Sequence, residues 1–135
     1  MGKRSATNAD ILLVEDNPGD VRLIQEALGE TPHNLHITRD GKEALDFLHQ
    51  RNGFTDVPYP DIALLDLNLP RVDGIEVLEA IRSDPDLDRV RVIVLTSAQR
   101  KDTDIDPDAI GEDDFVTKPA DPDEFMTLVR SRVAD

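Results

Sequence analysis

The chain has 135 residues, with 15 Lys and Arg against 29 Asp and Glu, so its formal net charge is −14. This length fits one domain, and so large a surplus of acid disfavours binding to nucleic-acid phosphates or to an anionic membrane surface, because both depend on Lys and Arg. The absence of cysteine excludes disulfides, thiolate metal sites and cysteine nucleophiles. No apolar run is long enough to span a bilayer. We therefore expect a cytoplasmic protein with a flexible tail over residues 1–9 and one domain over residues 10–135.

Three short and almost purely apolar runs stand out at residues 11–14, 62–65 and 92–95. They are rich in Ile, Val and Leu, as is typical of parallel strands that are buried on both faces. Two weaker strands fit residues 35–38 and 115–117. The sequence therefore predicts five strands.

Amphipathic segments that alternate with these strands predict helices. Each helix start is marked by an Asn or Asp suited to capping, followed by Pro or Gly: Asn17-Pro18, Asp40-Gly41, Asp73-Gly74 and Asp121-Pro122. The first of these helices should end near Gly29. Between Lys101 and Asp114, Pro107 and repeated Asp residues leave room for a short or irregular fourth helix at most.

Strand and helix thus alternate five times, which favours an α/β sandwich with helices on both faces of a parallel sheet. We expect a flavodoxin-like doubly wound fold, with five strands in the order 2-1-3-4-5 and five helices. Ligands of such sheets bind beyond the carboxyl ends of the strands. The functional residues should therefore lie at those ends.

The predicted strand ends carry carboxylates, a hydroxyl and an ammonium group. Glu15-Asp16 follows the first strand, Asp66 the third, Thr96 the fourth and Lys118 the fifth. Three carboxylates at one edge repel one another unless a cation neutralises them, and Mg²⁺ prefers such oxygen ligands. Asp66 is the candidate nucleophile toward phosphorus, because an aspartyl phosphate can form when Mg²⁺, Lys118 and Thr96 offset the charge of the phosphoryl group.

Four segments resemble the receiver domains of two-component response regulators. They are the segments LVEDN at 13–17, LDLNLPRVDG at 65–74, LTS at 95–97 and FVTKP at 115–119. All four occur in the family's order and spacing, and the resemblance extends from about Asp10 to Arg132. It implies a stand-alone phosphoacceptor switch rather than an enzyme, with no activity beyond self-phosphorylation and self-dephosphorylation.

The resemblance assigns the metal and the acceptor. It implies that a histidine kinase phosphorylates Asp66. Asp16 and Asp66 would bind Mg²⁺ together with the backbone carbonyl of Asn68, and Glu15 would contribute through a water molecule.

The resemblance also implies a switch and partners. Thr96 would move toward the phosphoryl group and the side chain of Phe115 would follow it, while the Lys118–Pro119 peptide bond would be cis. Residues 17–23 and 44–48 resemble single-domain receivers that serve phytochrome-like kinases. Because the chain ends directly after the last helix, we expect no output domain, and a downstream protein target would read the switch.

Other readings remain open at this point. One is a Mg²⁺-dependent phosphohydrolase with Asp66 as nucleophile, although Asn68 stands where many such enzymes carry a second Asp. Another is a scaffold that has lost the chemistry, although every expected site residue is present. The acidic segment 102–114 disfavours pairing through the face beside it, so we expect a monomer. Asp20 is interpreted as a solvated or turn residue.

The site uses only three of the 29 acidic residues. The remainder is dominated by Asp, with 21 Asp and 8 Glu against only 4 Lys. A surface rich in Asp and poor in Lys resembles the proteins of salt-accumulating organisms, in which high ionic strength screens self-repulsion. We therefore expect a halophilic protein whose fold depends on molar salt.

Overall fold

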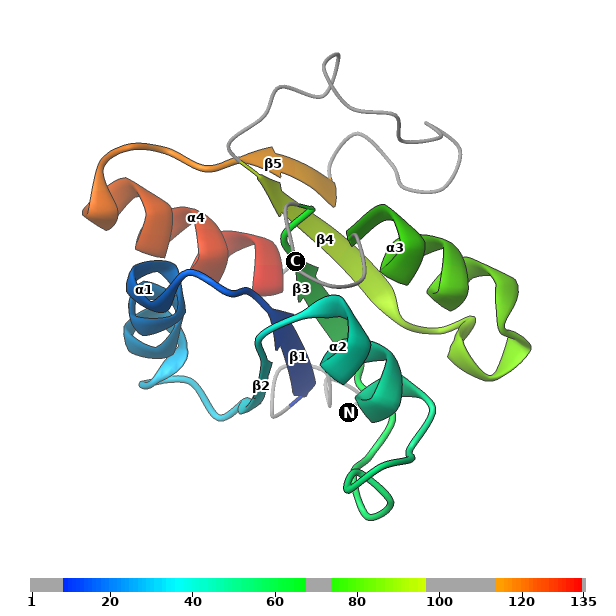
Figure 1. Ribbon diagram of the computed structural model, residues 1–135. Helices are drawn as coiled ribbons and strands as arrows, with labels where there is room; N and C mark the ends of the chain where they lie inside the picture. Colours follow the sequence, from blue (N-terminus) through cyan, green and yellow to red (C-terminus); the bar gives the residue numbers. More distant parts are fainter. Residues whose placement is uncertain (1–8, 68–73, 97–113, 135) are drawn as a thin grey trace.

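The structure, a computed structural model, describes residues 9–67, 74–96 and 114–134. These residues form five strands and four α-helices that alternate along the chain (Figure 1). In chain order the elements are β1 (Asp10–Val14), α1 (Pro18–Leu28), β2 (Asn34–Thr38), α2 (Gly41–Leu48), β3 (Ile62–Leu65), α3 (Gly74–Ser83), the 3-10 turn η2 (Pro85–Leu87), β4 (Arg91–Thr96), β5 (Phe115–Thr117) and α4 (Pro122–Ala134). Within the described ranges no helix has the length and apolar character needed to cross a bilayer. The irregular helix expected between residues 101 and 114 lies outside them.

The five strands form one parallel sheet in the order β2-β1-β3-β4-β5, which confirms the predicted topology. β3 is the middle strand, and β1 and β4 pair with it on either side. Every strand begins and ends within one residue of its predicted bounds. Local sequence patterns, strong for three strands and weaker for two, therefore located all five strands.

Alternate residues of the strands point into two apolar layers. Ile11 and Leu13 of β1 join the layer that includes α1 and α4, whereas Leu12 and Val14 join the layer that includes α2 and α3. Figure 1 shows the same division, with α1 and α4 on one face of the sheet and α2 and α3 on the other. All four side chains are at most 1% exposed. Burial on both faces explains why the strands are continuous apolar runs rather than alternating ones.

The described helix starts have the predicted caps. The side-chain oxygen of Asn17 accepts hydrogen bonds from the N–H groups of Gly19 at 2.8 Å and Asp20 at 3.2 Å, and Pro18 is the first residue of α1. Asp40 accepts the N–H of Glu43 at 2.7 Å and so caps α2. These bonds satisfy donors that the first turn of a helix leaves unpaired.

Gly74 brings the start of α3 against the backbone that follows β3. Its N–H donates to the carbonyl of Leu67 at 3.2 Å. A Cβ at position 74 would lie 2.5 Å from the carbonyl oxygen of Asp66 and 2.6 Å from Cα of Leu67. Both are backbone atoms, so no side-chain rotation can relieve the contact. Gly74 therefore permits a close approach that fixes residues 66 and 67.

The carboxylate of Asp46 organises the turn after α2. It accepts hydrogen bonds from Arg51 Nε at 2.9 Å, Lys42 Nζ at 3.0 Å and Asn52 Nδ2 at 3.1 Å, and the residue is 6% exposed. The hydrogen bonds from Arg51 and Lys42 lower the pKa of Asp46 to about 2. Gln50 and Asn52 adopt φ angles of 55° and 53° in this turn. The network thus holds a backbone conformation that residues other than glycine adopt infrequently.

The peptide bond between Lys118 and Pro119 is trans, like every other peptide bond of the described residues. The cis bond expected from the resemblance is therefore wrong. Trans is also the favoured isomer before proline, by about 0.5–1 kcal/mol, where the fold does not enforce the other.

Candidate phosphoacceptor site

The backbone places Glu15 and Asp66 side by side at the carboxyl ends of neighbouring strands. The N–H of Glu15 donates to the carbonyl of Thr38 at 3.0 Å, and the N–H of Asp66 donates to the carbonyl of Val14 at 3.0 Å. Both bonds continue the parallel pairing of the strands by one residue. The two acidic residues therefore leave the sheet at the same edge, as predicted.

Three carboxylates gather at this edge. Glu15, Asp16 and Asp66 each offer an oxygen, and the three oxygens lie within 4.8 Å of one another. Glu15 is 1% exposed and Asp66 7% exposed, whereas Asp16 is exposed to solvent. A cluster of hard oxygen ligands that is open on one side can hold a divalent cation such as Mg²⁺ and still admit a phosphate.

Burial makes the negative charge of Glu15 unfavourable. Burial, and next the hydrogen bond with Asp66, raise the pKa of Glu15 to about 7, although the hydrogen bond from Lys118 acts in the opposite direction. A carboxyl group with so high a pKa competes for protons near neutral pH. A divalent cation would favour the ionised form of Glu15 by supplying positive charge, so the donor set fits Mg²⁺.

Lys118 follows β5 and brings an ammonium group into the cluster. Its Nζ lies 2.8 Å from Glu15 Oε1, 2.8 Å from Asp20 Oδ2 and 3.2 Å from Asp66 Oδ2. Burial alone would lower the pKa of Lys118, but the hydrogen bonds to Asp20 and Glu15 outweigh burial and raise the pKa above its ordinary value. The group is therefore a fixed positive charge beside the proposed acceptor.

Asp20 belongs to this site, and the prediction that it is a solvated or turn residue is wrong. It lies in the first turn of α1, and its carboxylate pairs with an ammonium group 98 residues away in the sequence. The available signal was its place three residues after the capping Asn17, which puts it at the helix end nearest the carboxyl end of β1. The choice of Lys118 as its partner has no local signal.

Two predicted site groups cannot be placed. Thr96 ends β4 and pairs in register with Thr117 of β5, but its side chain lies outside the described part of the structure, as does all of Asn68. Phe115 begins β5, is half-buried and packs against the apolar layer covered by α2 and α3. The roles assigned to these three residues remain predictions.

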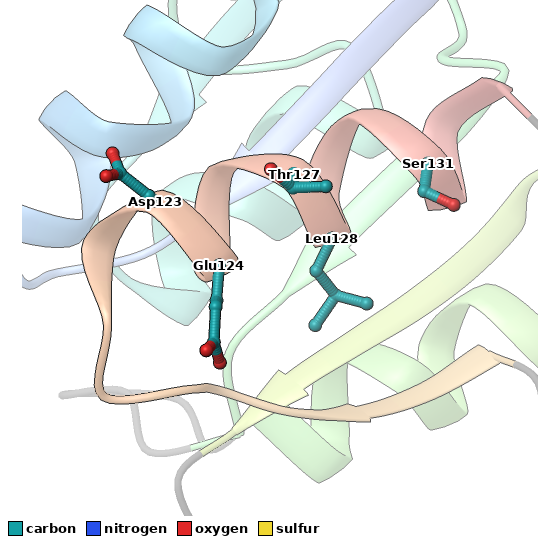
Figure 2. A pocket seen from close by; sticks show the side chains of 5 residues that line it. All are labelled: Asp123, Glu124, Thr127, Leu128 and Ser131. Carbon is teal, nitrogen blue, oxygen red and sulfur yellow. The ribbon is translucent and has the colours of Figure 1, made fainter.

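A cavity of about 400 Å³ lies on α4 (Figure 2). It is lined by Asp123, Glu124, Thr127, Leu128 and Ser131. None of these is a predicted site residue, and the carboxylate cluster does not contribute to the lining. Among the described residues, the cavity is therefore separate from the predicted site at the strand ends.

Known proteins are similar to this chain in sequence. Residues 11–130 match the family model described as the response regulator receiver domain. The response regulator Rcp1 of Synechocystis sp. (strain ATCC 27184 / PCC 6803 / Kazusa) is 49% identical over 94 residues, which cover 68% of this chain. The match spans 64% of the length of that curated relative, which is less than two thirds.

Solved structures extend the likeness to the whole fold. The phosphorylated cyanobacterial phytochrome response regulator RcpA is 40% identical, with a TM-score of 0.81 and coverage of 93% of this chain and 91% of that one. The Mn²⁺-bound form of Rcp1 is 38% identical, with a TM-score of 0.82 and coverage of 91% and 90% respectively. Similar structures have thus been determined both phosphorylated and with a divalent metal bound.

Proposed function

The chain belongs to the response-regulator receiver family, and we propose that it is a phosphoacceptor switch in two-component signalling with Asp66 as the acceptor. The observation that carries this proposal is the place of Asp66. Asp66 directly follows the middle strand of the sheet and is 7% exposed. Its carboxylate belongs with Glu15 and Asp16 to a cluster that could hold a metal ion, and it lies 3.2 Å from Lys118 Nζ. A buried carboxylate acceptor, a place for a divalent cation and a nearby ammonium group favour phosphoryl transfer to Asp66.

The proposed reaction is a transfer from phosphohistidine to carboxylate. A carboxylate oxygen of Asp66 forms the new P–O bond while the P–N bond of the phosphohistidine breaks. The leaving imidazole nitrogen keeps the bonding electron pair and takes a proton from solvent. Lys118, and the hydroxyl of Thr96, would donate hydrogen bonds to the phosphoryl oxygens and so stabilise the charge of the transferred group.

Mg²⁺, when bound, supplies positive charge opposite the phosphoryl oxygens. We propose Asp16, Asp66 and the backbone carbonyl of Asn68 as direct ligands, with Glu15 acting through water. The carboxylate oxygens within 4.8 Å of one another support this assignment. Burial and the neighbouring Asp66 raise the pKa of Glu15, which agrees with a site that gains from an added cation.

We propose that the chain is cytoplasmic and that the partner that donates its phosphoryl group is a histidine kinase of the phytochrome class. The names of the similar proteins support this class, since RcpA is a cyanobacterial phytochrome response regulator. Phosphorylation would bias the protein toward a second conformation through Thr96 and Phe115, and a downstream protein would recognise that form. Comparison of phosphotransfer from phytochrome-class and other kinases tests the assignment, and equal rates would contradict it.

Incubation with Mg²⁺ and acetyl phosphate, followed by intact-mass measurement, tests the central proposal. We expect the gain of one phosphoryl group, which alkaline treatment removes and which Asp66→Asn lacks. Folded protein that gains no phosphoryl group would refute the switch. Continuous multiple turnover of a phosphate ester, abolished in Asp66→Asn, would instead indicate a phosphohydrolase.

We also propose a monomer that needs high salt. The net charge of −14 supports both, because like charge opposes association and compaction in dilute buffer. Light scattering during gel filtration should give the monomer mass in molar KCl before and after phosphorylation. A dimer in either state would contradict the proposed monomer.

A further inference from the structure

The carboxylate of Asp20 contacts Lys118 from outside the cluster that can hold a metal. We propose that Asp20 is a positioning residue that holds the ammonium group of Lys118 toward α1 and thereby restrains phosphorylation of Asp66. This inference rests on the proposed function of Asp66 and adds to it an element that sets how readily the site accepts a phosphoryl group.

The ammonium group of Lys118 donates hydrogen bonds to three different carboxylates. An ammonium group has three N–H donors, and three carboxylates surround this one. Nζ lies 2.8 Å from Glu15 and 2.8 Å from Asp20, but 3.2 Å from Asp66. All three donors are therefore engaged, and the longest of the three contacts is the one to the proposed acceptor.

Asp20 differs from the other carboxylates that contact Lys118. Glu15 and Asp66 belong to the metal-holding cluster, which does not include Asp20. The side chain of Asp20 is 24% exposed, whereas that of Glu15 is 1% exposed. Asp20 thus lies outside the cluster that could hold a metal, and its contact with Lys118, which also contacts Asp66, is the route of influence that we propose.

The charge of Asp20 is anchored by α1. Asn17 caps this helix by accepting the N–H of Asp20 at 3.2 Å, and the first turn of a helix favours a carboxylate through the helix dipole. Val21 and Ile24 hold the same helix against the sheet, at 3% and 0% exposure. The helix therefore holds Asp20 in place, and any change in the contact between Asp20 and Lys118 requires the ammonium group of Lys118 to move.

Phosphorylation changes what Lys118 has to neutralise. The phosphoryl group adds negative charge and new acceptor oxygens at Asp66. To donate hydrogen bonds to these oxygens, the ammonium group must weaken its hydrogen bond to Asp20. Removing the charge of Asp20 should therefore free Lys118 for the phosphoryl group and also lessen the repulsion of an anionic phosphodonor.

Asp20→Asn tests this inference, because Asn keeps a side-chain oxygen that can accept the N–H of Lys118 but carries no charge. Asp123→Asn is the matched control, since Asp123 is an exposed Asp in the first turn of α4 and its loss changes the net charge and a helix terminus equally. Asp20→Glu keeps the charge and serves as the conservative variant. Asp20→Ala provides a second neutral variant should Asp20→Asn fold poorly.

Two measurements apply to each variant. The rate of phosphorylation by acetyl phosphate at fixed Mg²⁺ reports the reaction, and the affinity for beryllium fluoride with Mg²⁺, followed by fluorine NMR, reports binding of a phosphoryl mimic without reaction. We expect Asp20→Asn to react faster and bind beryllium fluoride more tightly, each by about two- to fivefold. Asp123→Asn should match the wild type, and Asp20→Glu should stay closer to it than Asp20→Asn.

The outcomes separate this inference from the proposed function. Wild-type protein that takes up neither phosphoryl group nor beryllium fluoride refutes the function of Asp66 and the role of Asp20 together. If the wild type responds and Asp20→Asn is indistinguishable from it, or is slower and binds more weakly, the role of Asp20 alone is refuted. An equal gain in Asp123→Asn would assign the effect to net charge and would overturn the inference as well.

Discussion

Substitution of Gly74 by Ala tests how closely α3 must approach the proposed acceptor. In most helices this change is neutral or stabilises by up to about 1 kcal/mol, because glycine loses more backbone entropy on folding. Here the new Cβ would lie 2.5 Å from the carbonyl oxygen of Asp66 and 2.9 Å from that of Leu67. We therefore expect Gly74→Ala to lower the stability of the protein, the opposite of the usual effect of this substitution.

The cost follows from the nature of these contacts. Overpacking costs about 1–3 kcal/mol, and the upper part of this range applies because backbone must shift. After subtraction of the usual gain, we expect a net loss of about 2 kcal/mol, or roughly 8 °C in melting temperature for a domain of this size. Since the backbone that shifts carries Asp66, the rate of phosphorylation by acetyl phosphate should also fall, by about tenfold or more.

Urea and thermal unfolding followed by circular dichroism measure the first effect, and intact mass against time measures the second. Gly29→Ala is the control, because Gly29 has a right-handed φ of −66° and its Cβ would come no closer than 3.0 Å to the carbonyl of Gln25. That variant should stay within about 1 kcal/mol of the wild type. A Gly74→Ala protein as stable and as reactive as the wild type would show that the close approach does not position the site.

Three further predictions concern charge. Lys118→Ala should still be phosphorylated at Asp66, but the NMR signals of Phe115 should no longer respond; a wild-type response would exclude Lys118 from the switch. Because the folded-state pKa of Asp46 is depressed to about 2, its charge contributes stability above roughly pH 4 and loses this contribution as the pH falls toward 2. The unfolding free energy of Asp46→Asn should therefore fall less than that of the wild type between about pH 5 and pH 3, and equal slopes in urea titrations would contradict this. Finally, the melting temperature of the wild type should rise between dilute buffer and molar KCl, and an unchanged value would refute the proposed dependence on salt.

The sequence could predict the strands of the sheet because their patterns lie within a few neighbouring residues. A run such as residues 62–65 is apolar throughout, since both faces of the middle strand are buried. The alternation of strands and helices predicts a doubly wound parallel sheet, and the order 2-1-3-4-5 is that of the flavodoxin-like fold. Caps such as Asn17 and Asp40 are equally local, because each bonds backbone groups two or three residues away. Within the described residues, the helices that these signals predicted are present.

The cation of the site is where local reasoning was incomplete. The place of Lys118 after the last strand indicated its presence at the edge, but not its division among three carboxylates. Local sequence predicts only that Asp20 is a solvated or turn residue. Its contact with Lys118 joins α1 to the end of β5, and only the packing of these elements reveals it.

By itself, then, the sequence determined the strands, the capped helix starts, the edge at which the acidic residues meet and the family. The tertiary structure alone decided the environment of each charge: the raised pKa of Glu15, the lowered pKa of Asp46, and the pairing of Asp20 with Lys118. It also decided why position 74 must be glycine. The physical reason is range: hydrophobic periodicity and capping act over a few neighbouring residues, whereas desolvation, ion pairing and close backbone contact depend on distances between residues that are far apart in the chain.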